Sequence, residues 1–381
     1  MECDMTNKTT THQYLRHLDA VEVTNAPNKA SHPQRRGTFN WEPAVVDGID
    51  CRLWRRVYPL ATAEDVKKSG GQWEKGDEML PGGIPDVDPS YVLRAELVRE
   101  IAYAVWPHDQ GDPEPMVLSG AAGTGKTTLV EQIAARLRIP VYRVNLNVGT
   151  TVRHLKGRVG AVAGQGTVFV PGIATMAMEH HAWLLLDEIS GVTPPVALAL
   201  FPILEAKGRV LLEDAQPPRY IRRSEHFRVF GTDNTLGAHM ETTRFSYAGT
   251  NPDMNAALLD RFTGGVVPVG YLSPAAEFKA IKAKVPGIDS ETLEGMIIVA
   301  NNIRESREIT AGFSTRMLIS WARRFQNGYV GSDGEQQTPT YDDDTWVLET
   351  ATRAFLNKQK TMVEKDAMAE VIRRTFVIGA G

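Results

Sequence analysis

Between residues 86 and 270, short apolar runs alternate with amphipathic stretches along the chain. This alternation is typical of a parallel sheet whose strands are connected by helices. The expected strands are residues 116–119, 141–145, 183–186, 227–231 and 266–269, and expected helices include 127–137 and 196–206. The pattern predicts an α/β fold with a parallel five-stranded sheet flanked by helices.

After Tyr271 the strand pattern stops and apolar residues recur at helical spacing. The expected helices are residues 275–283, 290–303, 315–325, 344–358 and 363–374, with a polar loop at 331–343. An all-helical domain over residues 271–381 follows from this change of period. The Gly- and Pro-rich stretch at 81–85 marks the other boundary, so the α/β domain is expected over residues 84–270.

The first 83 residues form an N-terminal extension with a different composition. Residues 1–40 are polar and lack periodicity, which predicts a mobile arm or a docking segment. Several aromatic residues between 40 and 80 are enough to pack a small subdomain.

Composition narrows the class of protein. The 381 residues include 42 Lys and Arg against 46 Asp and Glu, a net charge of −4, so binding of nucleic acid by bulk positive charge is not favoured. Cys3 and Cys51 cannot build a disulfide framework, which favours a reducing compartment. Neither a secretory signal nor an apolar run of about 18 residues is present, which predicts a soluble, cytoplasmic protein without a membrane span.

The strongest candidate chemistry is the sequence G-x-x-x-x-G-K-T at residues 120–127, placed between an expected strand and an expected helix. Such a loop points successive backbone N–H groups at phosphate oxygens. Lys126 would reach the β- and γ-phosphates, and the Thr127 hydroxyl would bind Mg²⁺. The expected nucleotide-binding residues are Gly120, Ala121, Ala122, Gly123, Thr124, Gly125, Lys126, Thr127 and Thr128. The strand and helix disfavour the alternative, a Gly-rich turn with an exposed lysine.

Two further strands end in polar residues. Asp187 and Glu188 follow the apolar run 183–186; Asp187 would bind Mg²⁺, and Glu188 would polarise the water that attacks the γ-phosphate. Asn234 ends the next strand and would lie near that water, although a turn residue is an equal alternative. Arg261 and Arg316 could stabilise phosphate charge, but from the residues alone surface positions are favoured for both.

These motifs, in this order and spacing, resemble the AAA+ ATPases, specifically the MoxR branch and, within it, the ATPase subunit of aerobic cobaltochelatase (CobS type). The resemblance covers roughly residues 84–325 and is carried by 84–91, 139–146, 227–237, 259–262 and 315–322 in addition to the phosphate loop. It implies a P-loop NTPase core with a helical lid domain, using ATP and Mg²⁺. Residues 231–234 read Gly-Thr-Asp-Asn where relatives carry Ala-Thr-Ala-Asn or Ala-Thr-Gln-Asn, which leaves Asn234 in place.

The resemblance also implies roles and partners. Asn234 matches sensor 1, Arg316 matches sensor 2, and Arg261 matches an arginine finger that acts on the neighbouring subunit. Residues 155–169 match a β-hairpin inserted into helix 2 and facing the pore of a ring, and the loop 236–251 is expected at the pore or an interface. The implied assembly is a homo-oligomer, a hexameric ring.

The implied function is an ATP-driven motor that remodels a partner protein or drives a chelatase-type complex, together with a von Willebrand-type metal-ion-adhesion protein. The alternative is a motor acting on nucleic acid or in a phage or defence assembly. The basic run 219–223 bears on this alternative, but an interface or a solvated turn is the favoured interpretation. His180 and His181 are expected at a helix end or turn and not in a metal site, and residues 342–344 at a helix N-terminus.

Overall fold

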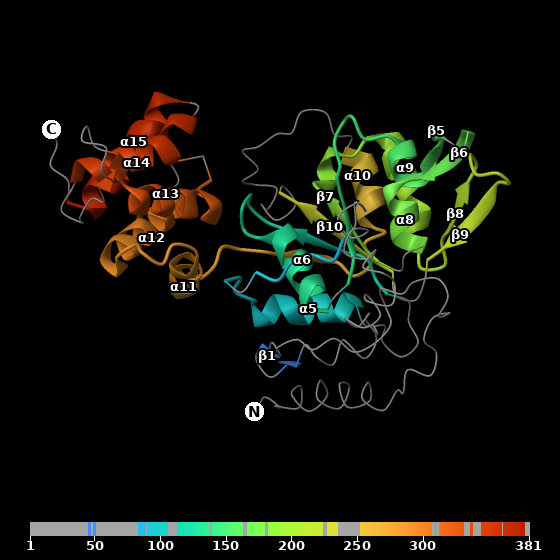
Figure 1. Ribbon diagram of the computed structural model, residues 1–381, viewed down its shortest axis with the longest axis horizontal. Helices are drawn as coiled ribbons and strands as arrows, with labels where there is room; N and C mark the ends of the chain where they lie inside the picture. Colours follow the sequence, from blue (N-terminus) through green and yellow to red (C-terminus); the bar gives the residue numbers. More distant parts are fainter. Residues whose placement is uncertain are drawn as a thin grey trace.

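The computed structural model shows two folded parts, a sheet covered by helices and a group of C-terminal helices (Figure 1). It describes residues 45–46, 49–50 and 83–377, except 89, 106–112, 138, 163–165, 180–181, 224–226, 235–251, 307–308, 310–311, 331–335, 338–343 and 360. Within the N-terminal extension, β1 (Val45–Val46) pairs antiparallel with β2 (Ile49–Asp50). The other expectations for residues 1–82, and those for the loop 236–251 and for His180 and His181, lie outside the described residues.

The predicted five-stranded parallel sheet is confirmed. Its order is β11-β3-β10-β7-β4, and every neighbouring pair is parallel. The strands are β3 (Met116–Ser119), β4 (Val141–Asn145), β7 (Trp183–Asp187), β10 (Arg228–Asp233) and β11 (Val266–Pro268). All residues of β3, β7 and β10 are buried, which explains their continuous apolar runs, because helices cover both faces of such a sheet.

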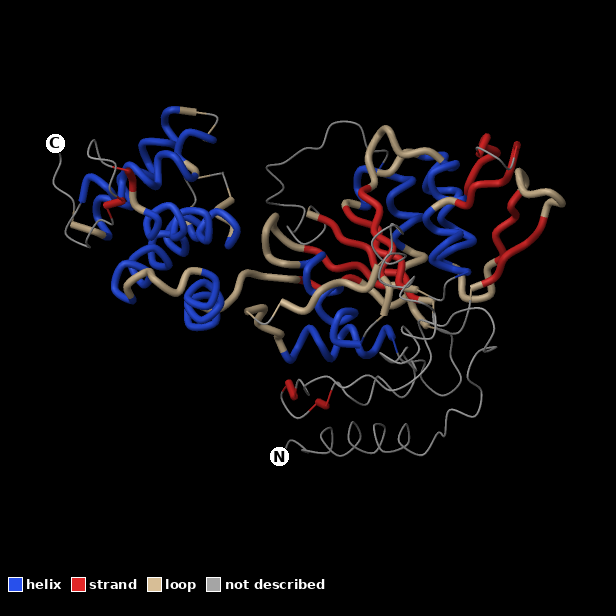
Figure 2. The backbone as a smooth tube through the Cα atoms, viewed as in Figure 1, coloured by secondary structure: helices blue, strands red, loops and turns tan. Residues whose placement is uncertain are grey.

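The helices form one layer on each face of the sheet (Figures 1 and 2). One layer contains α5 (Ala95–Val105) and α6 (Lys126–Leu137), whose apolar side chains share a core with β3 and β11. The other contains α8 (Ile173–Glu179), α9 (Pro194–Leu204) and α10 (Pro252–Leu259), which pack in a second core. The expected helices 127–137 and 196–206 correspond to α6 and α9.

Two β-hairpins extend from this second layer. The predicted hairpin within 155–169 is confirmed: β5 (Gly157–Val162) pairs with β6 (Gly166–Pro171), between α7 (Val152–Lys156) and α8. The basic run 219–223 was expected at an interface or in a solvated turn. The turn was wrong for residues 219–222, because β9 (Arg219–Arg222) pairs with β8 (Arg209–Leu212), whereas the interface stays a prediction. Ile221 is the one buried residue of this strand and its strand neighbours are exposed, so the sequence shows no apolar–polar alternation there.

The C-terminal helices have a core of their own. They are α11 (Pro274–Lys284), α12 (Ser290–Glu305), α13 (Thr315–Asn327), α14 (Asp344–Ala354) and α15 (Met362–Thr375). Side chains of Ser273, Asp289 and Ser314 accept hydrogen bonds from the first turns of α11, α12 and α13, which fixes where these helices begin. The helical C-terminal region predicted from the sequence is confirmed.

Two details of this region differ from the prediction. The expected helix 344–358 ends at Ala354, and a short 3₁₀ helix, η4 (Leu356–Lys358), follows. Phe355 leaves helical geometry with φ −150° and turns its fully buried ring edge-on against Phe313 and Trp321. β12 (Tyr329–Val330), directly before the polar loop, pairs with β13 (Gln336–Gln337) inside it. Strands of two residues are too short to show a period. Among the described residues, no helix is long and apolar enough to cross a bilayer.

Candidate active site

The polar residues predicted on different strands meet at the carboxyl edge of the sheet. Asp187 and Asp233 end β7 and β10, which are neighbours in the sheet. Ser119 lies opposite Asp233 in the register of β3 and β10, so the phosphate loop at 120–125 begins beside Asn234. Parallel register alone therefore brings three sequence motifs together.

Lys126 is 6% exposed and lies at the centre of this edge. Its Nζ donates hydrogen bonds to the carbonyl oxygens of Gly120 at 2.8 Å and Ala121 at 2.9 Å, and to Oδ1 of Asn234 at 2.7 Å. Burial lowers the pKa of the Lys126 amine, and the surrounding carboxylates act against that shift. The hydrogen bonds hold the amine inside the loop, where a phosphate group would replace the carbonyl oxygens as its partner.

Both oxygens of Asp187 are engaged. Oδ1 accepts from the hydroxyl of Thr127 at 2.8 Å and from that of Thr232, and Oδ2 accepts from Arg143 at 3.1 Å (Nε) and 2.5 Å (Nη2). Burial acts to raise the pKa of Asp187, but these hydrogen bonds outweigh it and hold that pKa below its usual value. Arg143 was not among the predicted site residues. A charged residue inside the apolar strand 141–145 could have indicated that it binds an acidic group.

Glu188 has φ 58° and ψ 58°, the left-handed region that non-glycine residues rarely adopt. Its backbone N–H donates to Thr232 Oγ1 at 3.3 Å, and the next turn is fixed by Ser190 N–H donating to Asp233 Oδ2 at 2.9 Å. The side chain of Asn234 donates to Glu188 Oε1 at 3.2 Å while accepting from Lys126. A chain of hydrogen bonds thus joins the lysine, the asparagine and the glutamate.

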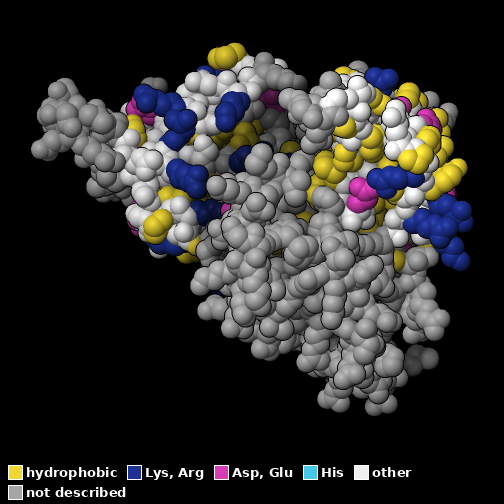
Figure 3. Space-filling model, turned by 45° about the vertical axis from the view of Figure 1, so that its right-hand side comes forward, with side chains coloured by type: hydrophobic (Ala, Val, Ile, Leu, Met, Phe, Trp, Pro, Cys, Tyr) yellow, Lys and Arg dark blue, Asp and Glu magenta, His cyan; other side chains and the backbone are white. Residues whose placement is uncertain are grey.

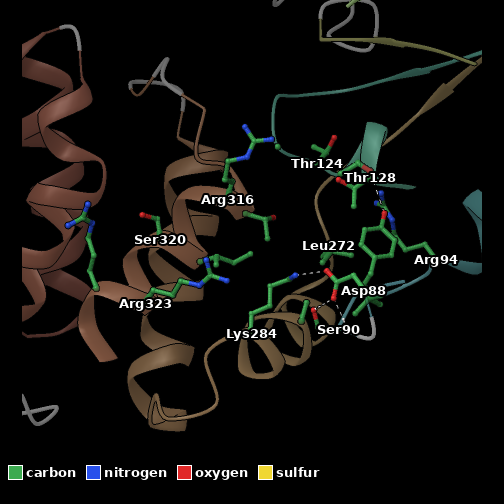
Figure 4. Close-up of a pocket in the computed structure, with 18 of the residues that line it drawn as sticks. Asp88, Ser90, Arg94, Thr124, Thr128, Leu272, Lys284, Arg316, Ser320 and Arg323 are labelled. Carbon is green, nitrogen blue, oxygen red and sulfur yellow. Dashed lines mark hydrogen bonds and ion pairs between the residues drawn. The ribbon is translucent and has the colours of Figure 1, made fainter. Parts of the chain in front are cut away.

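A cavity of about 670 Å³ lies between the phosphate loop and the C-terminal helices (Figure 4). From the sheet side it is lined by Gly123, Thr124, Gly125 and Thr128, and from α13 by Arg316 among others. In the space-filling view, basic side chains lie on the helical part beside the hollow that separates it from the sheet (Figure 3). The structure therefore brings Arg316 together with the phosphate loop, and the positive charge of Arg316 contributes to the lowered pKa of Lys126.

The segment before α5 closes the cavity from a third direction. Asp88 accepts from Lys284 of α11 at 2.5 Å (Figure 4). Its backbone N–H donates to Gln132 of α6 at 2.8 Å. The hydroxyl of Tyr91 donates to the carbonyl of Gly125 at 3.4 Å, and Arg94 donates to the carbonyl of Gly270 at 2.8 Å. Sequence reasoning assigned this segment no contact with the site, because these partners are remote along the chain.

The phosphate loop touches the helical part at Gly123. This residue has φ +78°, and a Cβ built on it would lie 2.4 Å from Cβ of Ser314, the residue that caps α13. Only a residue without a side chain permits this approach. Gly123 therefore sets how closely α13 can lie over the loop.

Replacing Gly123 by alanine is expected to weaken ATP binding by about 10–100-fold, because the new methyl group must push α13 away at a cost of about 1–3 kcal/mol. Gly265→Ala is the matched control: Gly265 has φ +81°, but nothing lies within 4 Å of a Cβ placed there. Both variants carry backbone strain, so both are expected to unfold at lower temperature. Titration with a fluorescent ATP analogue should show weaker binding by the Gly123 variant than by the Gly265 variant. Equal affinities of the two variants would contradict a role of the Gly123–Ser314 contact in ATP binding.

Arg261 lies outside the cluster formed by Lys126, Glu188 and Asn234. Its guanidinium stacks 3.6 Å from the ring centroid of Phe201, donates to the carbonyl of Ala257 at 2.8 Å and lies 3.5 Å from Glu205. These partners belong to α9 and α10 and to the residue that follows α9, and none of them is in the phosphate loop. The structure does not bring Arg261 together with Lys126, Glu188 and Asn234 of its own chain.

Hard oxygen donors suited to a divalent cation occur where the sequence predicted them. Asp187 and Thr127 present a carboxylate and a hydroxyl beside the phosphate loop. No group of three or more His, Cys, Asp and Glu side chains with metal-binding geometry occurs in the described part of the chain. A hydroxyl and a carboxylate at this position fit Mg²⁺, an ion that is usually bound through one or two carboxylates together with phosphate oxygens.

Comparison with known proteins agrees with this geometry. Residues 115–262 match the AAA domain of the dynein-related subfamily, and residues 277–334 match the C-terminal domain described as CbbQ/NirQ/NorQ. The aerobic cobaltochelatase subunit CobS of a Sinorhizobium species is 33% identical over 271 residues, covering 68% of this chain and 76% of that protein. This chain belongs to the MoxR-type AAA+ ATPases.

Two other relatives of this MoxR-type ATPase carry names that appear in the description of its C-terminal domain. Protein NorQ of Paracoccus denitrificans is 26% identical, covering 60% of this chain and 81% of that protein. The denitrification regulatory protein NirQ of Stutzerimonas stutzeri is 24% identical, covering 65% and 82%. The family and the phosphate-loop fold together establish the chain as a nucleotide-binding ATP hydrolase.

Proposed function

We propose that this MoxR-type ATPase is one subunit of a Mg²⁺-dependent hexameric ring that remodels a partner protein. The observation that carries the proposal is the separation of the two arginines. Arg316 lines the nucleotide cavity of its own chain, whereas Arg261 contacts Phe201 and Glu205 outside it. An arginine that cannot reach its own nucleotide is useful when a neighbouring subunit presents its site to it.

The chemistry is assigned to the residues at the carboxyl edge of the sheet. The N–H groups of residues 120–128 bind the triphosphate, with Lys126 released from its carbonyl partners to bind the terminal phosphates. Thr127 and Asp187 hold Mg²⁺, which when bound neutralises charge on the phosphate oxygens. Glu188 polarises the attacking water, and Asn234 orients Glu188 through their hydrogen bond.

Motion is proposed to arise at the cavity, because its two walls belong to different folded parts. Arg316 binds the terminal phosphate from α13, so loss of that phosphate releases α13 from the loop. Lys284 remains tied to Asp88, which is itself fixed to α6 through Gln132. The helical part therefore turns about that contact and does not separate from the sheet.

The client is proposed to be a protein or a chelatase-type complex reached through a von Willebrand-type metal-ion-adhesion protein. The name of the Sinorhizobium relative supports a chelatase-type complex, and the net charge of −4 gives no bulk attraction to nucleic acid.

Adding a von Willebrand-domain protein from the same genome is expected to raise the ATPase rate severalfold, whereas single- or double-stranded DNA leaves it unchanged. Light scattering in the presence of ATP should give about six times the subunit mass of 42.0 kDa. Glu188→Gln enzyme, whose turnover is expected to be about 10²–10⁴-fold lower than that of the wild type, gives the background for both rate assays. Stimulation by DNA and not by the protein would instead establish the nucleic-acid alternative.

A further inference from the structure

A buried ion pair joins α11 to α12 in the helical part, outside the residues assigned to catalysis. Arg304 of α12 and Glu277 of α11 form two hydrogen bonds of 2.8 Å, with side chains 8% and 0% exposed. Charges this far from water require complete hydrogen bonding to be tolerated. Their remaining partners therefore indicate what the pair holds in place.

One of those partners is Asn301 of α12, whose Oδ1 accepts from Arg304 Nη1 at 3.0 Å. The other hydrogen-bond partners lie on both sides of the residue that caps α13. Arg304 Nε donates to the carbonyl of Phe313 at 2.8 Å, and the hydroxyl of Thr315 donates to Glu277 Oε1 at 2.6 Å. Ser314, between them, is the residue that meets Gly123 of the phosphate loop. Arg316, which lines the nucleotide cavity, follows Thr315 directly.

The same arginine also contacts the connection between the two folded parts. The guanidinium carbon of Arg304 lies 4.1 Å from the ring centroid of Tyr271. Tyr271 lies in the segment that joins β11 to α11. Burial raises the pKa of Tyr271 further above its usual value.

We propose that Glu277, Arg304 and Thr315 are positioning residues that fix the first turn of α13, so that Arg316 is presented to the terminal phosphate of ATP. Tyr271 ties the same cluster to the inter-domain connection, so a change of angle there reaches Arg316 through buried contacts. This inference rests on the proposed role of Arg316. It adds that the arginine reaches the phosphate only while Glu277 holds Thr315.

The test is Thr315→Val, which removes the hydroxyl and keeps the shape. Titrations with a non-hydrolysable ATP analogue and with ADP should show about tenfold weaker binding of the ATP analogue, the value of one hydrogen bond to a charged group, and little change for ADP. Thr315→Ser keeps the hydroxyl and is expected to restore the preference for ATP. Thr350→Val is the matched control, because the Thr350 hydroxyl is buried in the same helical part and bonds Trp346, Val347 and Trp321.

A double variant separates positioning from a merely structural role. If Thr315 acts through Arg316, adding Thr315→Val to Arg316→Ala should cause no further loss of ATP-analogue binding. Additive losses, or a loss by Thr350→Val equal to that of Thr315→Val, would overturn the inference. If Arg316→Ala alone leaves binding of the ATP analogue unchanged, the proposed role of Arg316 fails instead.

Discussion

Glu188→Gln enzyme is expected to bind ATP as tightly as the wild type while its turnover falls by about 10²–10⁴-fold, the contribution of a positioned general base. The amide keeps the size of the side chain and can still contact Asn234, which now lies 3.2 Å from Glu188 Oε1. It cannot accept a proton from the attacking water. Steady-state phosphate release measures the turnover, and a fluorescent ATP analogue measures the binding.

The control for this prediction is Glu213→Gln. Glu213 is a glutamate at the end of β8 with a side chain 71% exposed and only a 3.9 Å approach to Lys156. The Glu213→Gln enzyme is expected to hydrolyse ATP at the wild-type rate. Hydrolysis by the Glu188 variant within twofold of the control would remove Glu188 from the mechanism, whatever its affinity for ATP.

The sequence was sufficient to predict the sheet because its central strands are buried on both faces. Met116–Ser119 and the other two central apolar runs stand out for that reason, and each ends at a motif residue or directly before one. The carboxyl ends of parallel strands meet at one edge, so Lys126, Asp187 and Asn234 could be expected together before any coordinates were known. The hydrogen bond between Lys126 and Asn234 follows from that topology and not from residue preferences.

The parts that the sequence did not predict depend on contacts between remote segments. Asp88 and Lys284 are 196 positions apart, and their pairing decides how the cavity is closed. Glu277 occupies the first turn of α11, where an acidic residue would normally indicate only a favourable helix start. Its complete burial and its bond to Thr315 arise from how three helices pack, for which a single sequence carries no local signal.

The position of Arg261 carries the largest mechanistic consequence. Within its own chain it is occupied by Phe201, Ala257 and Glu205, so its value to catalysis depends on a second copy of the chain. Arg261→Ala enzyme is expected to lose about 10³–10⁵-fold in turnover, as when an arginine finger is withheld, while its affinity for ATP is retained. An enzyme whose arginine acted within its own chain would show the same loss, so the single variant does not decide the matter.

Mixing two variants decides whether Arg261 acts within its own chain or on the neighbouring subunit. Lys126→Ala subunits cannot bind ATP productively but still carry Arg261, whereas Arg261→Ala subunits bind ATP but lack the finger. In randomly mixed rings about a quarter of the sites pair an intact binding subunit with an intact arginine, so the mixture should regain activity that neither variant has alone. Arg316→Ala mixed with Lys126→Ala is the matched control, because both changes damage the nucleotide site of the chain that carries them and no arrangement of those subunits restores one. Recovery in the first mixture and not in the second would place the missing arginine on the neighbouring subunit, whereas co-assembled rings without recovery in either mixture would contradict a finger acting between subunits.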